Sequence, residues 1–128
     1  MRLLLDTQAF LWWDDSPERL SAAAQAAIKD PANELLLSVV SVWEMAIKMQ
    51  LGKLRLTTPL AERISSQQAR NQFAVLPVEL RHTLQLTELP LHHKDPFDRL
   101  LVAQAQVEGA ALVSGDAALR HYAVTILW

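Results

Sequence analysis

Four acidic residues of this chain stand where predicted strands end or where the following helices begin. Asp6 comes directly after an apolar run that predicts a buried strand, and Asp116 follows a second such run after a Ser-Gly pair. Glu44 lies one turn into the helix predicted after a third run, and Asp98 lies in the first turn of the helix that opens at Pro96. Because ligands of parallel α/β sheets bind at the carboxyl ends of the strands, we expect these carboxylates to share one site.

Carboxylates gathered in this way point to a bound cation. Clustered negative charges repel one another and are costly unless something neutralises them. The chain has no cysteine, and oxygen ligands suit a hard cation such as Mg²⁺ or Mn²⁺. Such an ion can activate water and stabilise the charge of a phosphodiester that is cleaved in line. The acids therefore predict metal-assisted phosphodiester hydrolysis.

Each of these acids, like Asp95 just before Pro96, also has an ordinary structural interpretation. Asp6 and Asp95 each precede a predicted helix and fit the role of an N-cap, and Asp116 fits a turn. Asp98 is stabilised by the dipole of its own helix, and Glu44 forms an i,i+4 pair with Lys48. The site hypothesis depends on the fact that independent acids reach the same predicted sheet edge.

Strands alternate with helices along the whole chain, which is typical of βα units around a parallel sheet. We expect an α/β fold with a mainly parallel sheet of four to five strands. The predicted strands cover residues 2–5, 34–38, 73–77, 111–113 and 124–127. The predicted helices cover residues 7–13, 16–29, 38–50 (with Ser38 or Ser41 as the start), 59–71, 79–86 and 96–108, with a helical turn at 117–122.

Composition limits the class of protein. A chain of 128 residues with 51% hydrophobic residues fits one folded domain, residues 1–128. No apolar run approaches the roughly 20 residues that span a bilayer, so we expect no membrane segment. The lack of cysteine suits a reducing cytoplasm, which is the expected location. The net charge of −2 gives no overall attraction to nucleic acid, so such a function must rest on local features.

One stretch of the chain is locally basic. Residues 48–70 contain five basic residues and one acid, and we consider Lys48, Lys53 and Arg55 as candidates for binding an RNA backbone. An ordinary solvated helix face explains the same pattern. Arg99 stands beside Asp98 and could either pair with a carboxylate or contact phosphate.

Four segments together resemble the PIN-domain family, and within it the VapC-like toxins of bacterial type II toxin–antitoxin pairs. They are LLLDT at 3–7, SVVSVWE at 38–44, HKDPFDRLLVAQA at 93–105 and LVSGD at 112–116. The DPFDR piece is the most specific. The resemblance spans nearly the whole chain in the right order. It implies a three-layer α/β/α sandwich and an Mg²⁺- or Mn²⁺-dependent ribonuclease that acts on RNA, has a cognate antitoxin and forms a homodimer.

Carried over position by position, the resemblance assigns catalysis and metal binding to Asp6, Glu44, Asp98 and Asp116. It assigns supporting roles to the polar residues Thr7, Ser41 and Ser114. This chain departs from the family pattern in having a second acid, Asp95, near the third position. We expect Asp98 to take part directly and Asp95 to be a helix cap or an additional ligand. The family often has an aromatic residue a few positions after its last acid, and here the candidate is Tyr122.

Aromatic residues and histidines receive a more ordinary interpretation. Base stacking is within the chemistry of tryptophan, but for Trp12, Trp13, Trp43 and Trp128 we expect burial in the core or an interface. Trp12 and Trp13 cannot both point inward from one short helix, so one of them is a candidate for a dimer or antitoxin contact. The neighbouring histidines, His92 and His93, are interpreted as loop residues rather than metal ligands.

Two other functions remain to be compared with the ribonuclease. A signalling receiver domain also has an acidic Mg²⁺ pocket, but it needs an acid pair after the first strand, an Asp after the third and a Lys after a late strand. Asp6 is single, Val78 follows the third predicted strand, and no Lys follows residue 94. A catalytically inactive PIN-like binding module is the second alternative, and the presence of all four acids argues against it.

Overall fold

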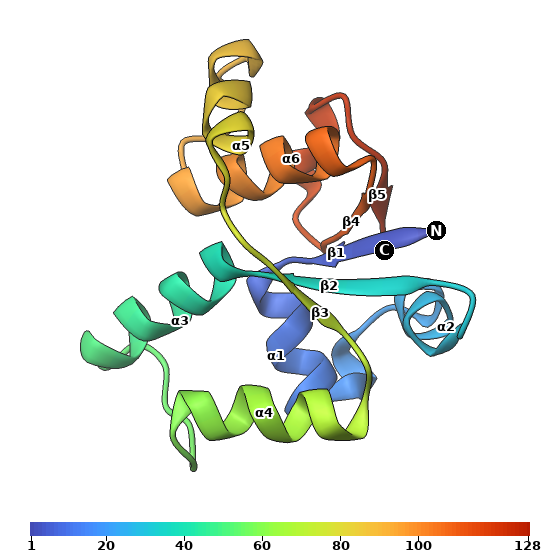
Figure 1. Ribbon diagram of the computed structural model, residues 1–128, viewed down its shortest axis with the longest axis vertical. Helices are drawn as coiled ribbons and strands as arrows, with labels where there is room; N and C mark the ends of the chain where they lie inside the picture. The colour runs from blue at the N-terminus through green and yellow to red at the C-terminus, as the bar shows by residue number, and fades with distance from the viewer.

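The computed structural model describes residues 1–128 and contains one sheet of five strands. All neighbouring strands are parallel, and their order is β3-β2-β1-β4-β5. The chain winds from β1 to β3 in one direction and then returns to the other side of β1 (Figure 1). The order therefore reverses between β1 and β4. The strands are β1 (Arg2–Leu5), β2 (Glu34–Ser38), β3 (Ala74–Leu76), β4 (Ala111–Val113) and β5 (Ile126–Leu127).

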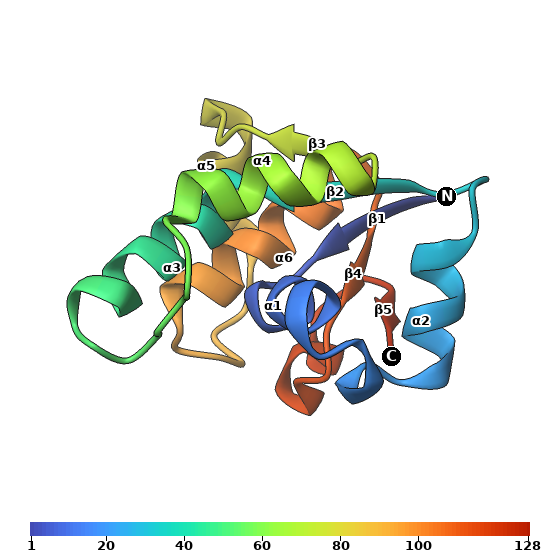
Figure 2. The ribbon, with the colours of Figure 1, turned by 90° about the horizontal axis from the view of Figure 1, so that it is seen from below.

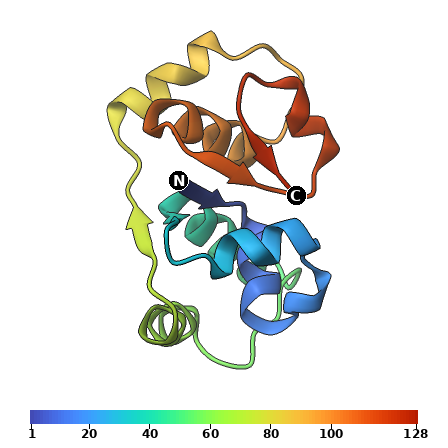
Figure 3. The ribbon, with the colours of Figure 1, turned by 90° about the vertical axis from the view of Figure 1, so that its right-hand side faces the viewer.

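Helices follow the strands and form two layers. Successive strand residues point to opposite faces, so Leu3 and Leu5 join a core cluster with residues of α1 and α2, while Leu4 joins a second cluster with residues of α6. Figures 2 and 3 show these layers on either side of the sheet. The α-helices are α1 (Thr7–Asp15), α2 (Ala22–Lys29), α3 (Val39–Gln50), α4 (Leu60–Arg70), α5 (Leu80–Gln85) and α6 (Pro96–Glu108). The 3-10 helices are η1 (Pro17–Arg19), η2 (Leu86–Glu88) and η3 (Ala117–His121).

The predicted α/β/α sandwich is confirmed, and the sheet is parallel throughout rather than mainly so. The single helix predicted for residues 16–29 is wrong. Leu20 is buried in an extended conformation, and Ser21 then caps α2 by accepting a hydrogen bond from the Ala24 amide at 3.0 Å. Of the two starts expected for α3, Ser38 is the cap, because its hydroxyl accepts from the Val40 amide at 3.0 Å. None of the helices is long and apolar enough to cross a membrane.

The amino edge of the sheet is fixed by charges around Glu108, the last residue of α6. Arg2 donates to Glu108 Oε1 at 3.2 Å, and Arg81 donates to Oε2 at 2.6 Å. His82 is fully buried, and its Nδ1 accepts the Glu79 amide, so its Nε2 carries the proton that reaches Glu108 Oε2 at 2.8 Å. The hydrogen bond from His82, aided by the two arginines, lowers the pKa of Glu108.

We expect Glu108→Gln to lower the free energy of unfolding at neutral pH by about 1–3 kcal/mol, since it weakens charge-assisted hydrogen bonds. A depressed carboxyl pKa adds stability above the unfolded-state value near 4.5 and loses it as the pH falls through the folded-state value. The gap between wild type and variant should therefore narrow as the pH falls below about 4.5 and close below the folded-state value. Urea unfolding at several pH values measures it, and a gap that failed to narrow as the pH falls below about 4.5 would contradict this account.

Candidate active site

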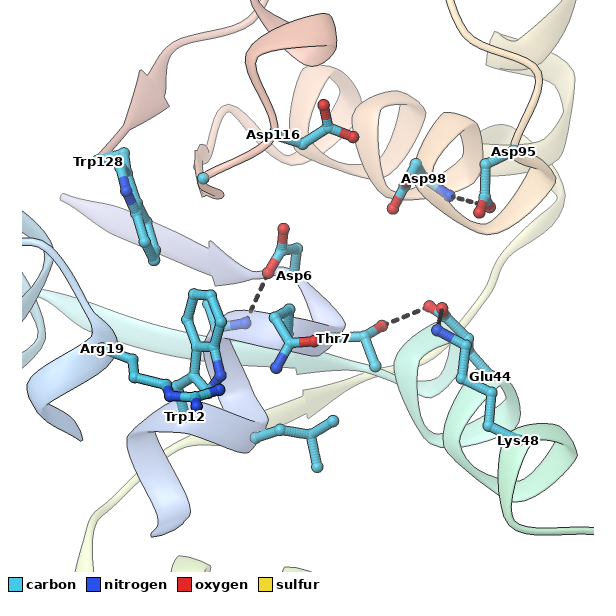
Figure 4. Close-up of a pocket in the computed structure, with 14 residues that line it drawn as sticks. Asp6, Thr7, Trp12, Arg19, Glu44, Lys48, Asp95, Asp98, Asp116 and Trp128 are labelled. Atoms are coloured by element: carbon cyan, nitrogen blue, oxygen red, sulfur yellow. Dashed lines mark hydrogen bonds and ion pairs between the residues drawn. The ribbon is translucent and has the colours of Figure 1, made fainter. Parts of the chain in front are cut away.

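The predicted acids line one cavity of about 530 Å³ at the carboxyl edge of the sheet. Asp6 enters it from the end of β1 and Asp116 from the loop after β4, which are the strands between which the order reverses. Glu44 reaches it from α3, and Asp95 and Asp98 reach it from the start of α6 (Figure 4). The structure thus places these residues together at one sheet edge.

Asp6 is held in place by its own helix. Its backbone N–H donates to Val113 of β4 at 3.0 Å, and its Oδ1 accepts the Ala9 amide at 2.7 Å as the N-cap of α1. Only 8% of the residue is exposed. Burial raises the pKa of Asp6, hydrogen bonds from Ser114 and Ala9 lower it, and the charges of Glu44 and Asp116 raise it further. The carboxylate is therefore firmly oriented, and its charge is not fully compensated by the protein.

Asp95 and Asp116 are oriented in the same way. Asp95 Oδ1 accepts the Phe97 amide at 2.8 Å and the Asp98 amide at 3.2 Å, and Asp116 Oδ1 accepts the Ala118 amide at 3.0 Å. The capping and site interpretations of these acids are compatible, because one oxygen of each carboxylate makes the cap. In Asp116 the second oxygen faces the other acids and meets a histidine.

Asp98 is a second acid whose ionisation the cavity disfavours. Its pKa is raised to about 7, first by burial and then by the negative charges of Asp95, Asp6 and Glu44. The nearby His93 offsets this only in part. A carboxyl group that resists ionisation beside other carboxylates marks the place where a cation would be most stabilising.

Glu44 is buried and already has partners for both oxygens. The Thr7 hydroxyl donates to Oε1 at 2.6 Å and lies 3.0 Å from the Ser41 hydroxyl. Lys48 Nζ is 2.7 Å from Oε2, and this contact raises the pKa of Lys48. The i,i+4 pair expected from the sequence is thus present and faces the cavity. Ser114, the third supporting residue, accepts the Asp116 amide at 3.1 Å.

His93 belongs to the site, although the sequence interpretation assigned it only to a loop. Its Nε2 lies 3.1 Å from Asp116 Oδ2 and 3.5 Å from Asp98 Oδ2, so the three residues group as ligands of a metal would. Its Nδ1, however, accepts the Asp95 amide at 3.0 Å, so Nε2 carries the proton of the neutral ring. In this geometry His93 donates to the Asp116 carboxylate and has no free lone pair for a metal. Its position two residues before Asp95 was the only signal in the sequence.

Arg99 does not reach a carboxylate, which corrects the first of its two expected roles. Its guanidinium donates to the Pro90 carbonyl at 2.9 Å and to the Tyr122 hydroxyl at 3.1 Å. Tyr122 is buried, and its hydroxyl also accepts the His93 amide at 2.9 Å. Both residues thus fix the loop that carries His93 and do not line the cavity.

The remaining candidates divide between the cavity and the surface. Of the three basic residues proposed for RNA, Lys48 lines the cavity, while Lys53 and Arg55 are exposed beyond the end of α3 and outside it. Trp12, Trp128 and Arg19 also line it, opposite the start of α6 (Figure 4). No local pattern of residues predicts that these three side chains lie together.

The residues present fit a divalent cation. Asp6, Asp98 and Asp116 present oxygen ligands from three elements, and the raised pKa values of Asp6 and Asp98 show that the protein itself leaves their charge uncompensated. Glu44 lines the same cavity, but its two oxygens are already engaged by Thr7 and Lys48. Hard oxygen ligands of this kind suit Mg²⁺ or Mn²⁺.

The fold and the site together define the class of protein. It is a parallel α/β sandwich with an acidic cavity at the point where the strand order of its sheet reverses. The family model for the PIN domain matches residues 3–124. The chain is 31% identical over 121 residues to ribonuclease VapC22 of Mycobacterium tuberculosis, and the match covers 94% of this chain and 91% of that protein. The chain belongs to the PIN-domain family.

Solved structures agree with this fold. A chain from the crystal structure of VapBC2 from Rickettsia felis, bound to a DNA fragment from their promoter, aligns with a TM-score of 0.74. Its sequence identity is 14%, and the alignment covers 98% of this chain and 97% of that one. A chain from FitAcB of Neisseria gonorrhoeae aligns with a TM-score of 0.59 and 16% identity, covering 97% and 95%.

We expect Asp98→Asn to stabilise the metal-free protein at pH 8 by about 1 kcal/mol or more, since it removes a charge that the cavity disfavours. A carboxyl pKa raised from 3.8 to about 7 means that the wild type loses stability as the pH rises between these values. The advantage of the variant should therefore shrink as the pH falls from 8 toward 4. Thermal unfolding in EDTA measures it, with Asp15→Asn on the exposed end of α1 as a control. A variant less stable than wild type at pH 8 would show that no repulsion exists.

Proposed function

We propose that the chain is a single-domain, metal-dependent endoribonuclease and the toxin of a bacterial type II toxin–antitoxin pair. The observation that carries the proposal is the convergence of Asp6, Asp98 and Asp116 on one cavity with uncompensated charge. The membership of the PIN-domain family and the similarity to a protein named as a ribonuclease support the same reaction.

In the proposed mechanism, Asp6, Asp98 and Asp116 hold Mg²⁺ or Mn²⁺, with Glu44 beside them. A cation bound there would act as a Lewis acid, activating water and offsetting the charge of the phosphodiester. The caps at Ala9 and Ala118 keep Asp6 and Asp116 oriented before the substrate arrives, which lowers the cost of reorganisation during the reaction. The role of Asp95 is to fix the first turn of α6, and with it Asp98.

Lys48 supplies the positive charge of the cavity wall. Its ammonium group lies 2.7 Å from Glu44 Oε2, and its side chain remains 46% exposed. We propose that it contacts a phosphate of the RNA next to the cleaved bond, because a half-exposed lysine can turn from a carboxylate to a phosphate without breaking the fold. Lys53 and Arg55 are proposed to follow the RNA backbone outside the cavity.

The partners follow from the same proposal. We propose a cognate antitoxin, in keeping with the resemblance to VapC-like toxins and with the VapBC2 complex among the similar structures. A homodimer is proposed because large apolar side chains are exposed, among them Trp43 at 56% and Leu91 at 85%. The RNA substrate implies action in the cytoplasm.

Loss of a site carboxylate should abolish cleavage. We expect Asp6→Asn and Asp98→Asn each to reduce Mn²⁺-dependent cleavage of single-stranded RNA by roughly 100-fold or more, because each removes a charged metal ligand. EDTA should stop the wild-type reaction. Gel analysis of a labelled RNA measures both effects, and expression of wild type but not of Asp98→Asn should arrest bacterial growth.

Asp15→Asn is the matched control, since it removes a carboxylate from α1 outside the cavity. It should cleave RNA as the wild type does. Cleavage that persists in EDTA would rule out the metal, and a well-folded wild type that cleaves no RNA would favour the inactive binding module.

The role of Asp95 can be separated from that of a metal ligand. Asp95→Ser keeps a side-chain oxygen for the cap, whereas Asp95→Ala loses the cap and should cost about 0.5–2 kcal/mol of stability. We expect Asp95→Ser to retain cleavage within a few-fold of wild type. A folded Asp95→Ser protein without activity would instead make Asp95 a ligand. Unfolding curves and initial rates at saturating Mn²⁺ distinguish the two.

A further inference from the structure

The wall of the cavity opposite the start of α6 is aromatic. The indoles of Trp12 and Trp128 lie with their centroids 5.9 Å apart at 42°, and both line the cavity together with Asp6 and Asp116 (Figure 4). Both residues are half-buried rather than enclosed. Trp13, by contrast, packs inward against Phe10 and Phe73. Of the two tryptophans of α1, Trp13 therefore packs against the core aromatics and Trp12 lines the cavity.

Trp128 rests against the loop that carries Asp116. Gly115 lies beneath its indole, and a Cβ at that position would come within 2.9 Å of Trp128 Cε2. Any larger residue at position 115 would displace the indole. Because Gly115 has no side chain, the Trp128 indole lies directly against this position, next to the carboxylate-bearing residue Asp116.

Arg19 adds a cation to this wall. Its guanidinium carbon lies 5.9 Å from the centre of the Trp12 ring, and the residue is exposed at the end of η1. It forms no ion pair with the site acids. The wall therefore combines apolar ring surface with one free positive charge, while the opposite side of the same cavity is acidic.

We propose that Trp12 and Trp128 bind the base of a nucleotide that flanks the cleaved phosphodiester, with Arg19 next to its phosphate. The proposal rests on the ribonuclease function proposed above. Flat rings beside a cation match a nucleotide, because every base offers a face for stacking and a phosphate for the guanidinium. A volume of about 530 Å³ lies within the range of small-molecule sites. The two indoles already contact each other, so the base stacks on the pair and does not enter between them.

The test combines single abasic substitutions in the RNA with substitutions in the wall. A single-stranded RNA cleaved by the wild type is prepared with one base removed at each position around the cleaved bond. We expect one flanking abasic site to lower kcat/KM about 5- to 100-fold. Trp12→Leu and Trp128→Leu should lower kcat/KM on intact RNA by a similar factor and show little further loss on the abasic RNA. Asp15→Asn, which changes an exposed residue of α1 outside the cavity, should behave as wild type.

Several results would overturn the proposal. They are a wild type that cleaves every abasic RNA at the same rate, tryptophan variants that lose activity equally on intact and abasic RNA, and variants that cleave normally but fail to bind the antitoxin. The last result would make the wall a protein contact. If a leucine variant does not fold, Trp128→Phe keeps an aromatic ring and should retain part of the dependence on the base.

Binding without cleavage separates this proposal from the proposed enzyme function. In an Asp98→Asn background, the same RNA should quench indole fluorescence, and Trp128→Leu should weaken its affinity about 5- to 100-fold at constant salt. Binding that depends on the wall in a protein whose wild type cleaves no RNA would contradict the enzyme function only. Cleavage by the wild type together with binding that ignores the wall would contradict the aromatic site only.

Discussion

The mutual repulsion of a few carboxylates is the constraint around which the carboxyl edge of this protein is organised. The sheet brings Asp6 and Asp116 together because β1 and β4 are neighbours, and α6 adds Asp98 from the opposite layer. Burial and these neighbouring charges raise the pKa of Asp98 to about 7. The fold tolerates this arrangement because stability is gained elsewhere, in two apolar clusters and in the charge network at Glu108.

Helix capping is the device that makes the arrangement possible. Asp6, Asp95 and Asp116 each begin a helical segment, so backbone N–H groups hold one oxygen of each carboxylate. Positive helix ends also offset part of the negative charge. Capping and chemistry are therefore not competing explanations of these residues. The same hydrogen bonds that begin the helices give the acids their fixed orientation.

Much of the fold and part of the site could be predicted from the sequence, because both depend on local patterns. Apolar runs marked all five strands, and acids that directly follow strands or open helices were found by that position alone. The contact of His93 could not be found, because it depends on how Tyr122 and Arg99 fold its loop. The pairing of Trp12 with Trp128 joins the two ends of the chain, and no local pattern records it.

The electrostatic interactions between β1 and α6 differ between the two edges of the sheet. At the amino edge, Arg2 and Glu108 attract each other, and at the carboxyl edge, Asp6 and Asp98 repel. An ion pair therefore holds these two elements together at the amino edge of the sheet, and like charges push them apart at the carboxyl edge. In the metal-free protein, thermal motion should therefore be greater at the carboxyl edge, where a cation would have to enter. The ion pair at the amino edge keeps the sheet and α6 in register.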